Sequence, residues 1–266
     1  MKTTYSLRET RSLSMVSAIV LLSILFSVRP VHAGTVKKCN QYDSVSITPT
    51  SNTYKVSNNI WNDANGSQCI QVNDANGNFS VVSSTHNKPT NGAPASYTFI
   101  NKGCHWGACT NNTKSGMPKQ VSALLNAASS WSTTQPTSGV YNVVYDLWFN
   151  KTSATSGQPD GAELMIWLAY VGNIQPVGSL IASGVSIAGA TWNVWGGSNG
   201  VNNVISYVRA SNAKYVCNLN LKAFTSDAVS RSYVQTSWYL ISVEAGFEIW
   251  QNGTGLSSNA FSILVE

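Results

Sequence analysis

Acidic residues are scarce in this chain, and their positions in alternating segments single out a few of them. Asp and Glu together make up 11 of the 266 residues. Successive side chains of a strand point to opposite faces, so residues two apart share a face. Three segments then carry acids and tryptophan on one face and apolar residues on the other: Glu163 with Met165 and Trp167, Glu248 with Glu244 and Trp250, and Asp146 with Trp148.

The chemistry that such acids suit is the hydrolysis of a glycosidic bond. One carboxyl group protonates the leaving oxygen, while a second attacks the anomeric carbon or activates a water molecule. A third carboxylate can orient one of the pair. Ordinary alternation with a solvent-facing polar side is the simpler alternative, but such a face rarely carries Trp and Met beside isolated acids. We therefore expect these side chains to line a cleft.

A hairpin between two of these segments would bring Asp146 and Glu163 together. If residues 142–150 pair antiparallel with residues 160–168, opposite residues have numbers that sum to about 310. Asp146 and Glu163 sum to 309, so we expect them to be near neighbours on one face unless a bulge shifts the register. Two carboxyl groups that close together titrate as a coupled pair.

The segments that position these side chains have the pattern of strands. Polar and apolar residues alternate, and Asn-Gly, Gly-Gly and Pro-Asp-Gly sequences separate the alternating runs. The expected strands are residues 56–61, 78–83, 140–150, 162–170, 191–195, 204–209, 215–221, 238–250 and 260–265. Residues 221–234 are a weak candidate for a helix. This pattern favours an all-β fold, a β-jelly roll of two stacked antiparallel sheets with a concave substrate cleft and at most one short helix.

The first 33 residues have the features of a secretory signal peptide. Basic residues precede an apolar run at residues 15–26, and a short segment with the small residues of a cleavage site follows. The apolar run is too short to span a bilayer. We expect residues 34–266 to form a single catalytic domain that is secreted, extracellular, monomeric and independent of membranes.

The charge of the chain argues against a nucleic-acid partner. Removing residues 1–33 lowers the formal net charge from +5 to +2, because that segment holds four basic residues and one acidic residue. A nucleic-acid-binding surface needs Lys and Arg clustered in a stripe. Only 10% of the residues are charged, whereas Ser, Thr, Asn, Gly and Trp are abundant. This composition suits a neutral substrate that is bound by aromatic faces and amide hydrogen bonds.

Five cysteines in an exported chain indicate disulfides. A local loop can close the short step from Cys104 to Cys109. Cys39 and Cys69 are then the natural longer pair. Cys217 is left unpaired, and we expect it to be a buried and inert thiol. The spacing differs from that of a structural zinc site, and histidines are few, so we expect neither a metal nor a cofactor.

Six short motifs occur in order along residues 39–265. They are NNIW (58–61), GCHWGAC (103–109), YDLWF (145–149), ELMIW (163–167), PVGS (176–179) and GFEIW (246–250). Each motif alone is weak, but together and in this order the chain resembles glycoside hydrolase family 12, the small β-jelly-roll endoglucanases. The GCHWGAC segment is similar to the bacterial branch of that family.

The resemblance implies a role for each motif. Glu163 matches the nucleophile and Glu248 the general acid/base of a retaining double displacement, and Asp146 matches an aspartate that is hydrogen-bonded to the nucleophile. Asn59 and Trp61 match the pair that holds a sugar on the non-reducing side. The other matched cleft positions are His105, Trp106, Met165, Trp167 and Pro176, and the Cys39–Cys69 bridge also follows the family pattern. The expected partner is a soluble β-1,4-glucan: a cellulose derivative, mixed-linkage β-glucan or, as a further candidate, xyloglucan.

Several alternatives stay open at this point. Trp61 could pack in the core instead of stacking on a sugar. Met165 taken alone would be a core residue, and only its shared phase with Glu163 makes a cleft position equally open. Glu244 shares the face of Glu248, and we expect it to be a structural or outer-cleft carboxylate rather than the acid. For the whole chain, the alternatives are a non-catalytic carbohydrate-binding jelly-roll module and a hydrolase of the same architecture that acts on xylan.

Overall fold

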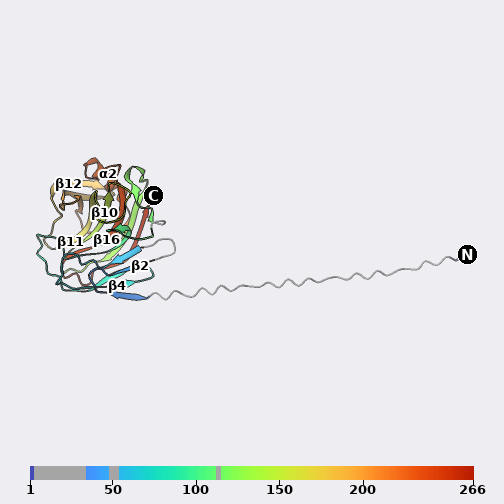
Figure 1. Ribbon diagram of the computed structural model, residues 1–266, viewed down its shortest axis with the longest axis horizontal. Coiled ribbons are helices and arrows are strands. Elements are labelled where there is room, and N and C mark those ends of the chain that lie inside the picture. The colour runs from blue at the N-terminus through green and yellow to red at the C-terminus, as the bar shows by residue number, and fades with distance from the viewer. Residues whose placement is uncertain (3–33, 48–53, 112–114) are drawn as a thin grey trace. The chain divides into compact units, whose positions relative to one another are not determined.

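The strands with the clearest alternation in the sequence form the centre of the larger of two sheets. In the computed structural model, β10 (Val140–Asn150) lies between β11 (Ala162–Val171) and β16 (Tyr239–Gln251) and is antiparallel to both (Figure 1). All three agree with the expected ranges to within one residue. The structure describes residues 1–2, 34–47, 54–111 and 115–266, so the expected signal peptide lies outside the described residues.

The larger sheet has eleven strands in the described part of the chain. Its order is β12-β13-β14-β11-β10-β16-β6-β3-β2, with β7 paired to β6 and β8 paired to β16. The strands not yet given are β2 (Ser44–Ile47), β3 (Tyr54–Ser57), β6 (Ser96–His105), β7 (Ala108–Cys109), β8 (Lys119–Gln120), β12 (Ser179–Ile187), β13 (Ala190–Ser198) and β14 (Asn203–Arg209).

One pair in this sheet is parallel, which corrects the expectation of purely antiparallel sheets. β11 pairs with β14 in parallel register. The chain leaves β11 for the edge of the sheet, where β12 and β13 form an antiparallel pair, and it returns inward through β14. A parallel neighbour needs a long crossover, and here the β12–β13 hairpin supplies it.

Among the described residues, the smaller sheet has six strands in the order β1-β4-β5-β17-β9-β15. Their bounds are β1 (Thr35–Lys38), β4 (Gln68–Asn73), β5 (Phe79–Ser84), β9 (Ala127–Thr134), β15 (Tyr215–Asn220) and β17 (Ser257–Val265). The helical elements that lie wholly within the described residues are a 3-10 turn, η1 (Val121–Ala123), and an α-helix, α2 (Leu221–Ser230). The all-β jelly roll with one short α-helix is thereby confirmed for the described residues.

Aromatic side chains hold the two sheets together. The ring of Trp131 on β9 lies 5.2 Å from that of Tyr145 on β10 and 5.7 Å from that of Phe247 on β16, and all three side chains are buried. Truncating an aromatic residue in such a core costs about 3–5 kcal/mol. Because Tyr145 and Phe247 face this core, alternation turns their neighbours Asp146 and Glu248 toward the opposite face of the sheet.

The helix packs on the same core and ends earlier than expected. Phe224 contacts Trp192 of β13 and Tyr207 of β14, with ring centroids 4.9 and 5.1 Å apart. The side chain of Asn220 caps the helix by accepting a hydrogen bond from the backbone N–H of Ala223 at 3.1 Å. The helix ends at Ser230, four residues before the expected limit at residue 234.

The structure contains both expected disulfides, Cys39–Cys69 and Cys104–Cys109. The expectation of a buried thiol at Cys217 is wrong, because this side chain is exposed. Cys217 lies on β15, an edge strand of the smaller sheet. The preceding residue on this strand, Val216, is the one that is buried. None of the described helices is long and apolar enough to cross a membrane.

Candidate active site

A single cleft of about 1200 Å³ runs over the outer face of the larger sheet and collects the candidate residues. Strands β10, β11 and β16 form its floor, and the loops at residues 90–94 and 173–178 border it. Every candidate site residue from the sequence lines this cleft: Asn59, Trp61, His105, Trp106, Asp146, Glu163, Met165, Trp167, Pro176 and Glu248. The apolar part of the floor is a separate cluster of buried side chains that includes Phe99, Val144 and Met165.

The register of the β10–β11 hairpin differs by one step from the expected one. Asp146 lies opposite Met165 and Trp148 lies opposite Glu163, so opposite residues sum to 311. A bulge between Val143 and Val144 shifts the register again in the half of the hairpin that lies farther from the turn. Asp146 and Glu163 are therefore diagonal neighbours on one face rather than direct partners, a relation that places side chains about 7–8 Å apart in general.

Glu248 approaches the same stretch of β10 from the other side. The backbone N–H of Glu248 donates to Oδ1 of Asn142 at 3.0 Å, and Nδ2 of Asn142 donates to the carboxylate of Glu248. Glu163 lies opposite residue 148 of β10 on the other flank. The two glutamates therefore stand on strands that flank β10, at opposite ends of one stretch, with Asp146 between them. This leaves space for a substrate across the strands.

Two asparagines that the sequence analysis missed hold the glutamates. Asn142 binds Glu248 as described, and Nδ2 of Asn199 donates to Oε2 of Glu163 at 3.2 Å. Asn199 follows β13 directly, in a segment of Ser, Asn and Gly that reads as a turn. In the sequence, Asn142 shares the phase of Asp146, which is a signal that could have indicated a cleft position.

Burial raises the pKa of all three acids. Asp146 is 2% exposed, and its pKa lies well above the usual range because of desolvation, and then because Glu163, Glu248 and Glu244 repel its charge. Desolvation likewise raises the pKa of Glu163, as does repulsion from Glu248, and desolvation raises the pKa of Glu248. These carboxyl groups therefore keep protons at higher pH than free ones do, a property that a proton donor needs.

Asp146 has one acceptor atom without a partner. Its Oδ1 is buried and makes no hydrogen bond to any described residue, and the hydrogen bond to Glu163 that the resemblance implied stays a prediction. The hydroxyl of Tyr97 lies beside the carboxyl group and lowers its pKa in part. The free oxygen is available for a proton shared with a neighbouring acid.

Exposed tryptophans form the walls of the cleft. Trp61 is 46% exposed and Trp106 is 42% exposed, whereas Trp148 and Trp167 are buried in the floor. Trp106 packs edge-on against Trp148, with ring centroids 4.8 Å apart. The core alternative for Trp61 is thereby excluded, and Met165, which is 5% exposed, lies in the buried floor beside the cleft.

The segment that carries Asn59 and Trp61 is a loop, not the end of a strand as expected. β3 stops at Ser57, and Asn59 has a φ of 45°, which an extended strand does not allow. The two side chains therefore do not share a strand face. Asn59 still contacts the sheet, because its carbonyl oxygen accepts a hydrogen bond from the backbone N–H of Tyr97 at 3.1 Å.

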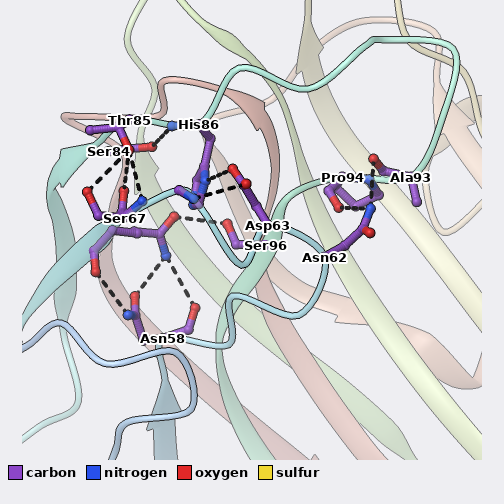
Figure 2. A network of polar contacts seen from close by, with 12 residues as sticks. Asn58, Asn62, Asp63, Ser67, Ser84, Thr85, His86, Ala93, Pro94 and Ser96 are labelled. Carbon is purple, nitrogen blue, oxygen red and sulfur yellow. Dashed lines mark hydrogen bonds and ion pairs between the residues drawn. The ribbon is translucent and has the colours of Figure 1, made fainter.

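A polar network fixes this loop on both sides of Trp61 (Figure 2). Before it, the buried Asn58 donates to the carbonyl of Gln68 at 3.0 Å and accepts from the Gln68 side chain at 2.8 Å. After it, Asn62 donates to the carbonyl of Pro94 at 3.0 Å. Asp63 pairs with Nδ1 of the buried His86 at 2.8 Å. Because these bonds satisfy buried polar groups, the loop conformation is well determined.

The opposite wall is a tight hairpin between β6 and β7. His105 pairs with Ala108, and the two central residues, Trp106 and Gly107, have φ values of 43° and 80°, as a type I′ turn requires. The Cys104–Cys109 bridge closes its base. Glu244 lies behind this wall and is fully buried, so the outer-cleft reading of Glu244 is wrong and a structural position is correct.

The described residues of the cleft include no cluster of potential metal ligands. Across residues 34–47, 54–111 and 115–266, no three His, Cys, Asp or Glu side chains cluster as metal ligands would. The carboxyl groups of Glu163 and Glu248 are instead held by the amides of Asn199 and Asn142.

An open groove with opposed acids on its floor and tryptophans on its walls is the arrangement of enzymes that cleave polysaccharides. A family model described as Glycosyl hydrolase family 12 matches residues 52–266. The chain therefore belongs to glycosyl hydrolase family 12 and is a glycoside hydrolase.

Curated and solved relatives agree with this assignment. The chain is 37% identical over 149 residues to "Probable cellulase Cel12b" of Mycobacterium tuberculosis, which covers 56% of this chain and 97% of the relative. It is 32% identical over 235 residues to "Probable xyloglucan-specific endo-beta-1,4-glucanase A" of Aspergillus terreus, covering 85% and 86% of the two chains. The solved structure "Endoglucanase cel12A from Rhodothermus marinus" superposes with a TM-score of 0.81 at 42% identity, covering 87% of this chain and 99% of that one.

Proposed function

We propose that this protein is a secreted endo-β-1,4-glucanase that cleaves internal bonds of soluble glucans with retention of configuration. The observation that carries the proposal is the placement of Glu163 and Glu248 on strands that flank Asp146, in one groove whose walls are exposed tryptophans. A long groove that crosses the strands suits internal cleavage of a chain. The names of the relatives as cellulase and xyloglucan-specific endoglucanase support the same substrate class.

The proposed reaction has two steps. In the first, the carboxylate of Glu163 attacks the anomeric carbon while the bond to the leaving oxygen breaks, and Glu248 gives its proton to that oxygen. A glycosyl-enzyme ester on Glu163 results. In the second step, Glu248 takes a proton from a water molecule, whose oxygen attacks the anomeric carbon and releases Glu163. The raised pKa of Glu248 fits the first of these roles.

Asp146 acts through Glu163. Its carboxyl group lies diagonally across the hairpin, is almost fully buried, and has a free acceptor oxygen. A proton shared between the two acids orients Glu163 for attack. Asp146 is therefore a positioning residue rather than a second nucleophile.

The walls bind the glucan. Trp61 offers an exposed ring to the flat apolar face of a sugar, and Asn59 lies beside it on the same loop to bond hydroxyl groups. His105 and Trp106 form the opposite wall. Met165, Trp167 and Pro176 line the cleft near the bond that is cleaved. We assign cellulose derivatives and mixed-linkage β-glucan as substrates, with xyloglucan as a further candidate.

A reducing-sugar assay tests the proposed substrate class. We expect release from carboxymethylcellulose and barley β-glucan and use xyloglucan and xylan as the comparison. Binding of glucans without any release would favour a non-catalytic binding module, and release from xylan alone would favour a hydrolase of different specificity. The mass of the exported protein tests secretion, since cleavage at the expected site leaves a chain that begins at Gly34.

Two glutamate variants test the assigned roles. Glu163→Ala should abolish hydrolysis, and added azide should restore turnover with an α-glycosyl azide as product. Glu248→Ala should keep activity toward aryl glycosides with good leaving groups, with azide giving the β product, because only protonation is lost. The opposite stereochemistry in the two variants would reverse the assignment.

A further inference from the structure

Glu244 is a fully buried acid that the proposed reaction does not use. It lies on β16 in the cross-strand row that contains Asn101 on β6 and Asp146 on β10. A buried carboxylate needs donors around it. Oγ of Ser242 donates to its Oε1 at 2.8 Å, and Nδ1 of His105 lies 3.0 Å from Oε1 and 3.2 Å from Oε2. Glu244 therefore holds a cleft-lining histidine from the buried side.

The ring of His105 is confined by its other neighbours as well. Its centroid lies 4.7 Å from that of Phe99 and 4.4 Å from that of Trp106. The backbone at His105 is fixed by its pairing with Ala108 at the base of the hairpin turn. With its position set in this way, the open question for the ring is which nitrogen carries the hydrogen.

The contact with Glu244 determines which ring nitrogen of His105 carries the hydrogen. An ionised carboxylate only accepts hydrogen bonds, so the nitrogen that faces it, Nδ1, carries a hydrogen. In the neutral ring the lone pair is then on Nε2. The side chain of His105 is 21% exposed and lines the cleft. Its Nε2 atom is not buried without a hydrogen-bond partner, unlike Nε2 of His86. Nε2 is thus the nitrogen that a ligand in the cleft can reach.

We infer that Glu244 is a positioning residue that keeps the hydrogen on Nδ1 of His105 and so presents the Nε2 lone pair to a hydroxyl group of the bound glucan. This inference deepens the proposed function and rests on it. The tryptophan walls of the cleft supply apolar faces and N–H donors, and Nε2 of His105 adds a neutral acceptor for a sugar hydroxyl group beside Trp106. Without Glu244, the ring is free to take the other tautomer, which would meet a hydroxyl hydrogen with an N–H group.

Nitrogen NMR of the full chain tests the tautomer directly. At a pH where the ring is neutral, His105 should show a protonated Nδ1 and an unprotonated Nε2. In Glu244→Gln the side-chain amide can donate to Nδ1, so the hydrogen should move to Nε2. The matched control is Asp63→Asn at the other carboxylate–histidine pair, which should alter the signals of His86 and leave those of His105 unchanged. Glu244→Asp, which keeps the charge on a shorter side chain, replaces Glu244→Gln if that variant does not fold.

Ligand titration and kinetics test the second half of the inference. Cellotetraose added to the inactive Glu163→Gln variant should shift the Nε2 signal of His105 far more than the Nδ1 signal. Glu244→Gln should lower kcat/KM on barley β-glucan roughly tenfold, the effect of losing one substrate hydrogen bond. In a His105→Ala background, Glu244→Gln should have less than a twofold further effect on kcat/KM, because Glu244 acts through His105.

The outcomes separate this inference from the proposed function. An Nε2–H tautomer in the parent chain, a tautomer that Glu244→Gln leaves unchanged, or losses that multiply in the double variant would each overturn the role of Glu244. A shift confined to Nδ1 on ligand addition would overturn the role of Nε2. If the parent chain hydrolysed no glucan, the proposed function would fail, while the tautomer of His105 would still decide whether Glu244 positions it.

Discussion

Trp61→Ala separates the binding role of the cleft from the stability of the fold. The side chain is 46% exposed, and a tryptophan side chain presents roughly 150–250 Å² in all, so a stacked sugar can cover roughly 60–100 Å² of it. At about 25 cal/mol per Å² this contact is worth about 1.5–2.5 kcal/mol, a roughly 10- to 70-fold loss of kcat/KM on a long glucan. An activated aryl glycoside too short to reach Trp61 should lose little.

The effect on stability should be modest, because about half of the ring is already in water. Truncation of a fully buried tryptophan costs about 3–5 kcal/mol, so we expect about 1–2 kcal/mol for Trp61→Ala. The matched control is Trp131→Ala, in which the ring is 1% exposed between the sheets; it should lose the full 3–5 kcal/mol. Thermal melts and kcat/KM on the long and the short substrate decide between the roles. Equal losses on both substrates with a melting temperature as low as that of Trp131→Ala would refute the binding role.

The carboxyl cluster gives three further predictions. Asp146→Asn should keep the fold, lower kcat and shift the acidic limb of the pH–rate profile, because one member of a coupled pair of carboxyl groups is removed; an unchanged profile with the parent kcat would make Asp146 a bystander. Asn142→Ala should move the basic limb to higher pH, since the amide that lowers the pKa of Glu248 is gone, and a shift to lower pH would contradict this. Burial raises the pKa of Glu163, so folding favours its protonated form and stability should fall as the pH rises from about 4.5 through that raised value. Melting temperatures of the parent and Glu163→Gln across this range check it, and the variant should show the flatter curve.

The floor of the cleft could be predicted from the sequence because it lies on strands with one core face and one cleft face. Alternation fixes which side each residue of β10, β11 and β16 takes, and all three strands were found to within a residue. The same signal failed on β6, where every residue except His105 is buried, so no alternation remains. It failed on β12 for the opposite reason, since most of that strand is exposed.

The exact pairing and the surroundings of the cleft residues could not be predicted, because they depend on contacts between distant segments. The register of the β10–β11 pair differed by one residue from the expected one, so Asp146 lies opposite Met165 and diagonal to Glu163. Glu244 and Glu248 have the same phase on one strand, yet Glu244 is sealed beneath a hairpin wall and Glu248 opens into the cleft. Asn199 lies in a turn-like segment, and only the return of β13 along the sheet brings it to Glu163.

Strands carry the acids of the cleft, whereas turns and loops form its walls, and this difference has a physical reason. Acids that must meet one bond need rigid neighbours, and paired strands provide them. The walls rise where the chain turns away from the sheet, in a loop after β3 and in the turn between β6 and β7, and both contain a residue with positive φ, Asn59 and Trp106. Such backbone persists only where its surroundings fix it. Each wall accordingly has a carboxylate–histidine pair with one buried member near its exposed tryptophan: Asp63 with the buried His86 near Trp61, and the buried Glu244 with His105 near Trp106.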